Sequence, residues 1–434
     1  MNMDKKLRHW VLVSKTFELL GRSLFLSSVF LDFKIKLMNP IIAYSCKNYV
    51  EFEILTINKI IAFMTSFIHR LVSLRQINPW VIGILILIAG IGFLMLYSAA
   101  NGSMAPWAWK QLLRFSIGFI LMIVVATIDS RSWMSYAYPL YSVALVLIIG
   151  VEIMGFVGMG AQRWIDLYII QLQPSEIMKI ALVLALARYF HKRTLVEIRH
   201  LPTLLFPLAL ILVPTLLVLR QPDLGTAVIL LLSGATLLFV AGVQWWKFAI
   251  AGTGILAAAP AIWILLYDYQ KNRILTFINP ENDPSNSGYH VSQSKIALGS
   301  GGIMGKGFLQ GTQSHLNFLP EKQTDFIFTM FSEEFGLLGG IVLLGLYSAL
   351  LAYGFKVAMT SRNSFGRLVA IGMTTIVFLY VFINMAMVMG MLPVVGVPLP
   401  FISYGGTALL TLLMGQGLIF SIAIHHNSRI GRNL

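Results

Sequence analysis

The stretch GTQSHLNFLPEKQTDFIFTMFSEEFGLLGG, residues 311–340, joins a long polar segment to a strongly apolar one, and this contrast organises the chain. Asp325 stands at the junction, directly before the apolar run that begins at Phe326. A carboxylate is therefore expected at a membrane surface, where desolvation raises its pKa and neighbouring cations lower it. Such a group can act as a general base. The alternative is that Asp325 caps the following helix, since Thr-Asp before an apolar run is a common helix start.

The composition is that of a membrane protein. Apolar residues make up 57% and charged residues 12% of the 434 residues, and the mean hydropathy is +0.78. These values predict a protein that crosses a membrane several times. The net charge is +14, but the Lys and Arg residues are scattered between apolar blocks, so we expect orientation in a membrane and no nucleic-acid partner. The single cysteine, Cys46, excludes an internal disulfide and a Cys-based metal cluster.

Apolar blocks of membrane-spanning length predict an all-α polytopic membrane protein with ten transmembrane helices. An even number of spans puts both termini on one side of the membrane. The short links and the C-terminal tail on that side carry ten Lys and Arg residues and the opposite links three, which predicts cytoplasmic termini. The predicted helices cover residues 79–99, 112–128, 135–156, 174–190, 202–219, 225–243, 247–267, 326–354, 367–391 and 403–424.

A long polar segment, about residues 270–325, separates the seventh and eighth predicted helices and would lie outside the cytoplasm. It is too long for a passive connection and too polar to lie in lipid, so we expect a folded extracytoplasmic cap over a cavity.

Residues 1–63 contain no uninterrupted apolar span and mix charged with apolar residues, which predicts a poorly organised N-terminal extension. A start codon assigned upstream of Met64 would explain it, and a peripheral amphipathic arm is the alternative. No cleavable signal peptide is evident. Residues 64–434 are then expected to form a single transmembrane domain.

A pair of opposite charges lies inside the fourth predicted span. Glu176 and Lys179 are three residues apart, which places them on one helix face, and Arg163 precedes them in an amphipathic interfacial stretch. Ionisable groups within a span usually face a partner or a watery cavity. The alternative is a pair that only anchors the helix end at the membrane surface.

Two further segments carry charge near the predicted outer surface. Asp223 lies in a short link fixed by Pro222 and Gly225, and its alternative role is to cap the next helix. The glycine-rich run GSGGIMGKG, residues 299–307, fails the Walker pattern. Its backbone N–H groups and Lys306 could still bind a pyrophosphate, although a plain loop fits equally.

Residues 390–406 place three prolines and four glycines at an outer membrane boundary. Proline cannot extend a helix, so we expect a kinked loop that packs on protein or lines a cavity. A rigid connection between helices is the other interpretation.

These motifs together resemble the SEDS family of RodA-like and FtsW-like cell-wall glycosyltransferases, over about residues 79–426. The segment DYQKNR, residues 268–273, and the sequence LPVVGVPLP, residues 392–400, look more like the RodA branch. The motifs that carry the resemblance are GAQRW (160–164), QPSEIMK (173–179), QPDLGT (221–226), FLPEKQTDFIF (318–328) and LPVVGVPLPFISYGG (392–406).

The resemblance implies that lipid II and a lipid-linked glycan strand react on the outer face of the bacterial cytoplasmic (inner) membrane during cell elongation, which maintains rod shape. It implies a class B penicillin-binding protein as the transpeptidase partner, and Asp325 as the catalytic residue. Arg163, Glu176, Lys179 and Asp223 would belong to the central cavity.

The same resemblance implies that Glu176 and Asp223 could hold a divalent cation, Mg²⁺ or Mn²⁺. Lys179, Arg163, Lys306 or that metal would stabilise the departing pyrophosphate. Gln323 stands where the family often has His, so a His-assisted proton relay is not expected.

Two other classes of function compete with this one. A lipid II flippase would line its path with charge through the whole bilayer, whereas Glu176, Asp223 and Asp325 gather near one boundary. A scaffold that only recruits a synthase is compatible with every residue pattern named above.

Overall fold

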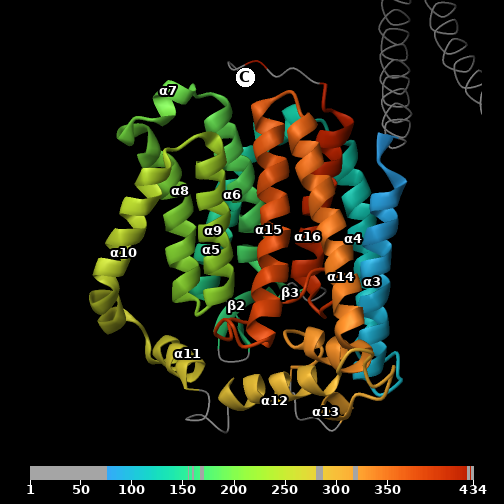
Figure 1. Ribbon diagram of the computed structural model, residues 1–434. Coiled ribbons are helices and arrows are strands. Elements are labelled where there is room, and N and C mark those ends of the chain that lie inside the picture. The colour runs from blue at the N-terminus through green and yellow to red at the C-terminus, as the bar shows by residue number, and fades with distance from the viewer. Residues whose placement is uncertain are drawn as a thin grey trace, which may run out of the picture. The chain divides into compact units, whose positions relative to one another are not determined.

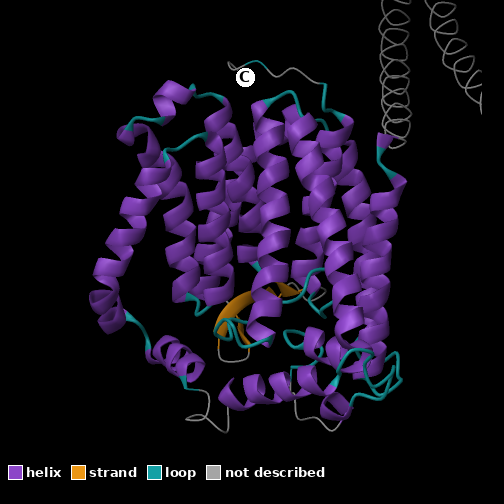
Figure 2. Cartoon of the chain, in the orientation of Figure 1, coloured by secondary structure: helices purple, strands orange, loops and turns teal. Residues whose placement is uncertain are grey.

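The computed structural model describes residues 76–154, 156–158, 161–166, 171–279, 287–315, 321–427 and 431. This part of the chain is almost entirely helical, with one small sheet near the end of the bundle where α11 and α12 lie (Figure 2). The extension predicted at residues 1–63 lies outside the described residues.

Each of the ten predicted spans falls on a helix, and eight of these helices are long and apolar enough to cross a membrane by length and composition. The helix α6 does not meet that measure, because it carries three charged residues, Glu176, Lys179 and Arg188. A multi-pass helical membrane protein is therefore confirmed, while the count of ten spans stays a prediction. The helices are α3 (Pro79–Ala99), α4 (Ala108–Thr127), α5 (Ser130–Met154), α6 (Pro174–His191), α8 (Leu201–Arg220), α9 (Leu224–Ala241), α10 (Trp245–Leu265), α14 (Ile327–Thr360), α15 (Ser364–Val388) and α16 (Gly406–Ile424).

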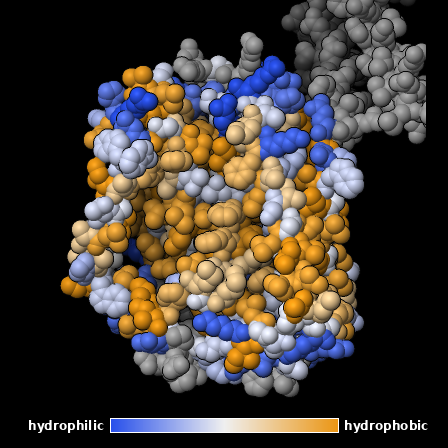
Figure 3. Space-filling view, in the orientation of Figure 1, coloured by the Kyte–Doolittle hydropathy of each residue, from blue (hydrophilic) through white to orange (hydrophobic). Residues whose placement is uncertain are grey.

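The helices α15 and α16 form the centre of the bundle, since 83% of the apolar window of each is buried, against 28% for α4. They pack against α4, α6 and α14. The flank of the molecule in Figure 3 is largely apolar, with hydrophilic residues gathered toward both ends. That pattern is the one expected where side chains face lipid in the middle and water at the ends.

The described chain enters and leaves the bundle at the same end. The start of α3 and the end of α16 lie there with α7 (Leu195–Ile198), while α11 (Asp268–Ile278), α12 (Ser287–Ser300) and α13 (Thr312–His315) lie at the other end (Figure 1). The predicted cap thus contains three helices, and α12 packs against the start of α14.

A three-stranded antiparallel sheet replaces the amphipathic interfacial stretch predicted around Arg163. Its strands are β1 (Phe156–Gly158), β2 (Ala161–Asp166) and β3 (Gln171–Leu172). Phe156 lies opposite Trp164, and Ile165 lies opposite Leu172. The backbone hydrogen bonds are therefore made between strands, which is how a non-helical segment beside a membrane satisfies its polar groups. The all-α prediction missed this element.

The segment between α15 and α16, residues 389–405, is non-helical, as its prolines predict, and most of residues 395–403 are buried. Val397, Leu399 and Phe401 are each 2% exposed or less. The segment also lines the cavity described below, so the predicted loop packed on protein is confirmed.

Candidate active site

Asp325 lies two residues before α14 and borders a cavity of about 670 Å³. The N-cap of α14 is Phe326, and no side chain caps the helix, so the capping alternative for Asp325 is wrong. Within the described part of the chain, the Asp325 carboxylate makes no hydrogen bond or ion pair. Its oxygens are therefore available to a bound molecule.

The wall beside this carboxylate is the backbone of Gly396. A Cβ atom on Gly396 would lie 3.4 Å from Oδ2 of Asp325, and the residue has a φ of +70°. Glycine adopts this left-handed conformation without the steric cost that other residues meet. A glycine at position 396 therefore lets the loop adopt this conformation beside the Asp325 carboxylate.

The pKa of Asp325 is raised to about 7, mainly because burial desolvates the carboxylate. The charges of Glu321 and Asp223 contribute to this rise, whereas those of Arg273 and Arg163 oppose it. A carboxyl group with a pKa near the working pH combines a substantial ionised fraction with a real affinity for a proton. The environment of Asp325 therefore suits a general base, as the sequence predicts.

Glu176 and Lys179 form the predicted pair. The distance from Lys179 Nζ to Glu176 Oε1 is 2.6 Å, and the two residues are 2% and 4% exposed. The alternative of a pair that anchors the helix end at the surface is wrong, because the ammonium group is buried. Both residues lie on α6.

The hydroxyl groups of two residues from other helices complete this cluster. Tyr380 of α15 donates to Glu176, with distances of 2.8 and 2.9 Å to the two carboxylate oxygens, and also accepts a hydrogen bond from Lys179. Thr411 of α16 donates to Glu176 Oε2 at 3.0 Å. The sequence analysis missed both residues; the available signal was a polar side chain within an apolar span.

Asp223 both caps a helix and lines the cavity. Its Oδ1 accepts from the backbone N–H of Thr226 at 3.3 Å, and its Oδ2 accepts from Gln173 Nε2 at 2.8 Å. The capping role is confirmed. The residue is only 4% exposed, so its carboxylate lies inside the protein.

Arg163 joins the sheet to the link before α9. Its Nε donates to the carbonyl oxygen of Gln221 at 3.1 Å, and a terminal nitrogen donates to that of Pro222. Both partners are neutral, so these bonds orient the guanidinium group at the cavity wall without neutralising its charge.

Lys306 is not among the residues that line this cavity. Its Nζ lies 2.7 Å from Glu333 Oε1 and donates to Thr312 Oγ1 at 2.8 Å. The expectation that Lys306 meets a pyrophosphate finds no support here, because its charge is compensated by the buried carboxylate of Glu333.

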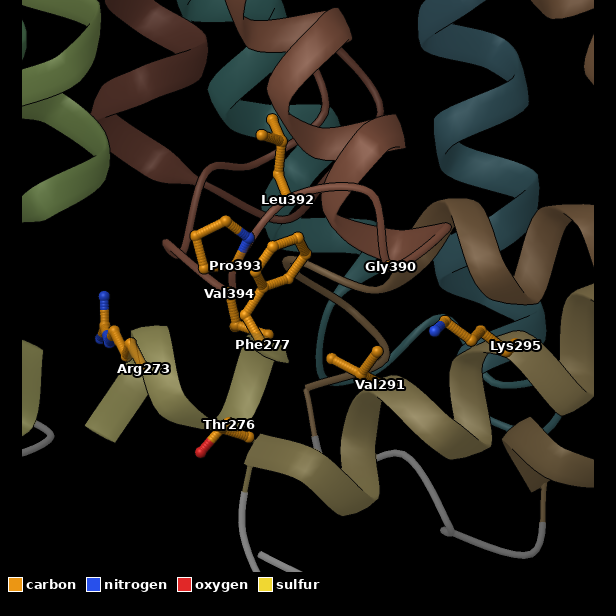
Figure 4. Close-up of a pocket in the computed structure, with 9 residues that line it drawn as sticks. All are labelled: Arg273, Thr276, Phe277, Val291, Lys295, Gly390, Leu392, Pro393 and Val394. Carbon is orange, nitrogen blue, oxygen red and sulfur yellow. The ribbon is translucent and has the colours of Figure 1, made fainter. Parts of the chain in front are cut away.

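A second pocket, of about 320 Å³, lies between α11, α12 and the loop after α15 (Figure 4). Arg273 and Lys295 stand at opposite ends of it, with Phe277, Pro393 and Val394 between them. The two cations do not converge on one point. Residues 392–394 line this pocket and residues 396–398 line the Asp325 cavity, so one loop separates the two.

A sequence model described as "Cell cycle protein", which covers FtsW, RodA and SpoVE, matches residues 78–428. The chain belongs to this FtsW/RodA/SpoVE family. The family expected from the motifs is therefore confirmed.

Members of the FtsW/RodA/SpoVE family share both sequence and fold with this chain. Peptidoglycan glycosyltransferase MrdB of Escherichia coli K12, a RodA protein, is 43% identical over 351 residues, 81% of this chain and 94% of MrdB. A solved structure titled "Structural coordination of polymerization and crosslinking by a peptidoglycan synthase complex" is 29% identical with a TM-score of 0.71, covering 81% of this chain and 99% of that one. The rod shape determining protein RodA of Thermus thermophilus is 27% identical with a TM-score of 0.61, over 81% of this chain and 98% of that one.

The divalent cation expected from the family finds a poor fit in this arrangement. Both oxygens of Glu176 accept hydrogen bonds, and so do both oxygens of Asp223. Across the described ranges, no group of three or more His, Cys, Asp or Glu side chains could hold a metal ion. A metal requirement stays a prediction, and the reaction proposed below has no step through a metal.

Proposed function

We propose that this protein is a peptidoglycan glycosyltransferase that polymerises lipid II into glycan strands on the outer face of the bacterial cytoplasmic membrane. Membership of the FtsW/RodA/SpoVE family and the 43% identity to MrdB support this activity, and the RodA-like relatives support a role in cell elongation. The observation that carries the proposal is the Asp325 carboxylate, which faces an open cavity and has a pKa of about 7.

In the proposed reaction, Asp325 removes the proton from the C4 hydroxyl group of the acceptor sugar. The oxygen then forms a bond to the anomeric carbon of the lipid-linked strand. The bond from that carbon to the pyrophosphate oxygen breaks, and the pyrophosphate leaves with the electron pair. A base at Asp325 lowers the barrier for the first change, and a nearby positive charge lowers it for the last.

Arg163 is the best candidate for that positive charge. Lys179 shares its charge with Glu176, whereas the hydrogen bonds of Arg163 go to neutral carbonyl oxygens. Arg163 also lines the same cavity as Asp325. A guanidinium group held in this way can form paired hydrogen bonds to a phosphate.

We further propose that both termini are cytoplasmic and that a class B penicillin-binding protein is the transpeptidase partner. The excess of Lys and Arg on one set of links supports the orientation, and the start of α3 and the end of α16 lie at one end of the bundle (Figure 1). The similarity to a chain from a peptidoglycan synthase complex supports the partner.

The test is to purify the protein with its transpeptidase partner and to supply lipid II in the presence of moenomycin. Glycan polymer is expected, and the partner alone should give none. Lipid II movement across liposomes without polymer would establish a flippase instead. A folded complex that neither polymerises nor moves lipid II would leave a scaffold.

A further inference from the structure

Three successive backbone carbonyls, those of Gln323, Thr324 and Asp325, are each held by a donor from α15 or from the loop that follows it. The backbone N–H of Tyr404 donates to the Gln323 oxygen at 2.9 Å. Ser403 Oγ donates to the Thr324 oxygen at 2.6 Å, and Asn384 Nδ2 donates to the Asp325 oxygen at 2.8 Å. The backbone that carries the proposed base is thereby fixed residue by residue.

We propose that Asn384 and Ser403 are positioning residues, which hold the Asp325 backbone against the 389–405 loop so that the carboxylate meets the acceptor hydroxyl at bonding distance. This inference rests on the proposed role of Asp325 as the base. Neither Asn384 nor Ser403 is among the residues that line the cavity, so each would act through Asp325 rather than on the substrate.

Asn384 connects the segment that carries Asp325 to the 389–405 loop through one amide group. Its Nδ2 also donates to the carbonyl oxygen of Val397 at 2.7 Å. Both neighbours are carbonyl oxygens, which only accept hydrogen bonds, so the nitrogen of the amide must face them. The single side chain therefore ties Asp325 to the cavity wall at Val397.

Packing alone does not explain an amide at this position. Asn384 is fully buried, and its Oδ1 has no hydrogen-bond partner within the described residues. A buried acceptor without a partner destabilises the fold, and a leucine of similar size would avoid that cost. A leucine would, however, lose the two hydrogen bonds that the Asn384 amide donates to Asp325 and Val397.

Ser403 connects the 389–405 loop both to the segment that carries Asp325 and to α4. Its Oγ accepts from the backbone N–H of Leu399 at 2.7 Å while donating to Thr324, and its carbonyl oxygen accepts from Gln111 Nε2 of α4 at 2.9 Å. The loop is thus fixed to itself, to α4 and to the residue before Asp325. Small displacements of the base are opposed from several directions.

This arrangement predicts a loss of turnover without a loss of substrate binding. A misplacement of the reacting group by about 1 Å can cost about 100-fold in rate, so Asn384→Leu should lower kcat by about 10- to 100-fold with KM nearly unchanged. Ser403→Ala removes the bonds to Thr324 and Leu399 but leaves the Asp325 carbonyl bound to Asn384, so it should have a smaller effect in the same direction.

The experiment compares lipid II polymerisation by the purified protein–transpeptidase complex carrying Asn384→Leu, Ser403→Ala or the control Thr374→Val. Thr374 is also buried on α15, but its Oγ1 bonds to Ala370 of the same helix at 2.7 Å. Melting temperatures report folding. Amide hydrogen exchange of residues 321–326 reports the backbone directly, and it should rise in the first two variants and not in the control.

A double variant separates positioning from a general packing effect. In an Asp325→Asn background, Asn384→Leu should reduce the residual rate no further, because the group that it positions is already gone. An equal fall in that background, or an unchanged kcat with unchanged exchange in folded Asn384→Leu protein, would overturn the inference. If Asp325→Asn alone keeps full activity, the proposed base is wrong, while hydrogen exchange still reports whether Asn384 holds the segment.

Discussion

The rate of polymerisation should depend on a single ionisation near neutral pH, because Asp325 takes a proton only in its ionised form. With a pKa of about 7, the ionised fraction of Asp325 is about one tenth at pH 6 and about nine tenths at pH 8. The value of kcat/KM should therefore rise about tenfold between these two pH values.

The direction of the stability effect is opposite. The folded pKa lies above the ordinary value of 3.8, so the folded protein binds more protons at Asp325 than the unfolded chain does between pH 3.8 and about 7. The contribution of Asp325 to stability is therefore largest at low pH and falls as the pH rises through that window. As the pH rises toward 7, kcat/KM should therefore increase while the contribution of Asp325 to folding stability decreases.

Two neighbouring charges provide a matched pair of variants. Glu321 raises the pKa of Asp325, so Glu321→Gln should shift the rise of kcat/KM with pH, here called the activity limb, to lower pH. Arg273 lowers that pKa, so Arg273→Gln should move the limb to higher pH. Neither side chain is among those lining the Asp325 cavity, and glutamine at 321 can still accept the hydrogen bond that Thr324 Oγ1 donates at 2.9 Å.

The assay is the initial rate of glycan polymer formation from limiting lipid II, measured between about pH 5.5 and 8.5. Melting at each pH controls for folding. A flat profile in the parent protein, or a limb that both variants move in the same direction, would refute Asp325 as the titrating base.

Three further outcomes follow from the structure. In a double-mutant cycle, Glu176→Gln and Lys179→Met should each destabilise the protein by about 3–5 kcal/mol, and the double variant by less than their sum; additive thermal unfolding data would contradict their pairing. Gly396→Ala should lower polymer yield, because alanine at a φ of +70° is strained and this strain falls on the loop beside Asp325, whereas Gly340→Ala, with open space around its Cβ, should not. A chain that starts at Met64 should keep its membrane insertion and activity, which a shape-complementation assay can check; loss of expression would show that residues 1–63 are needed.

The sequence located the helices well because membrane spans obey a length rule that needs no tertiary information. Each predicted block, such as 79–99, falls on a helix such as Pro79–Ala99. The pairing of Glu176 with Lys179 followed from their spacing on one helix. The strands at 156–172 were missed because runs of two to six residues are too short for their periodicity to show.

The partners of the site residues required the tertiary structure. Tyr380 is 204 residues from Glu176 in the sequence, and only the packing of α15 beside α6 brings them together. Lys306 has an anion-binding context in its own loop, yet Glu333, which lies 27 residues further on, compensates its charge. Local sequence patterns thus predicted the candidate polar residues. They could not predict which of these residues form ion pairs or hydrogen bonds with residues far away in the sequence.

The replacement Asp325→Asn tests the central claim most directly, because it preserves the size of the side chain while removing its basicity. The measurement is the amount of glycan polymer that purified Asp325→Asn protein and the parent form from lipid II, with detergent-solubilised yield and melting as folding controls. A base at Asp325 predicts a loss of about 10²- to 10⁴-fold at normal expression and stability. Substantial polymer from the asparagine variant would contradict that role and would require another base, to be sought among Glu176, Asp223, Glu321 and Glu333.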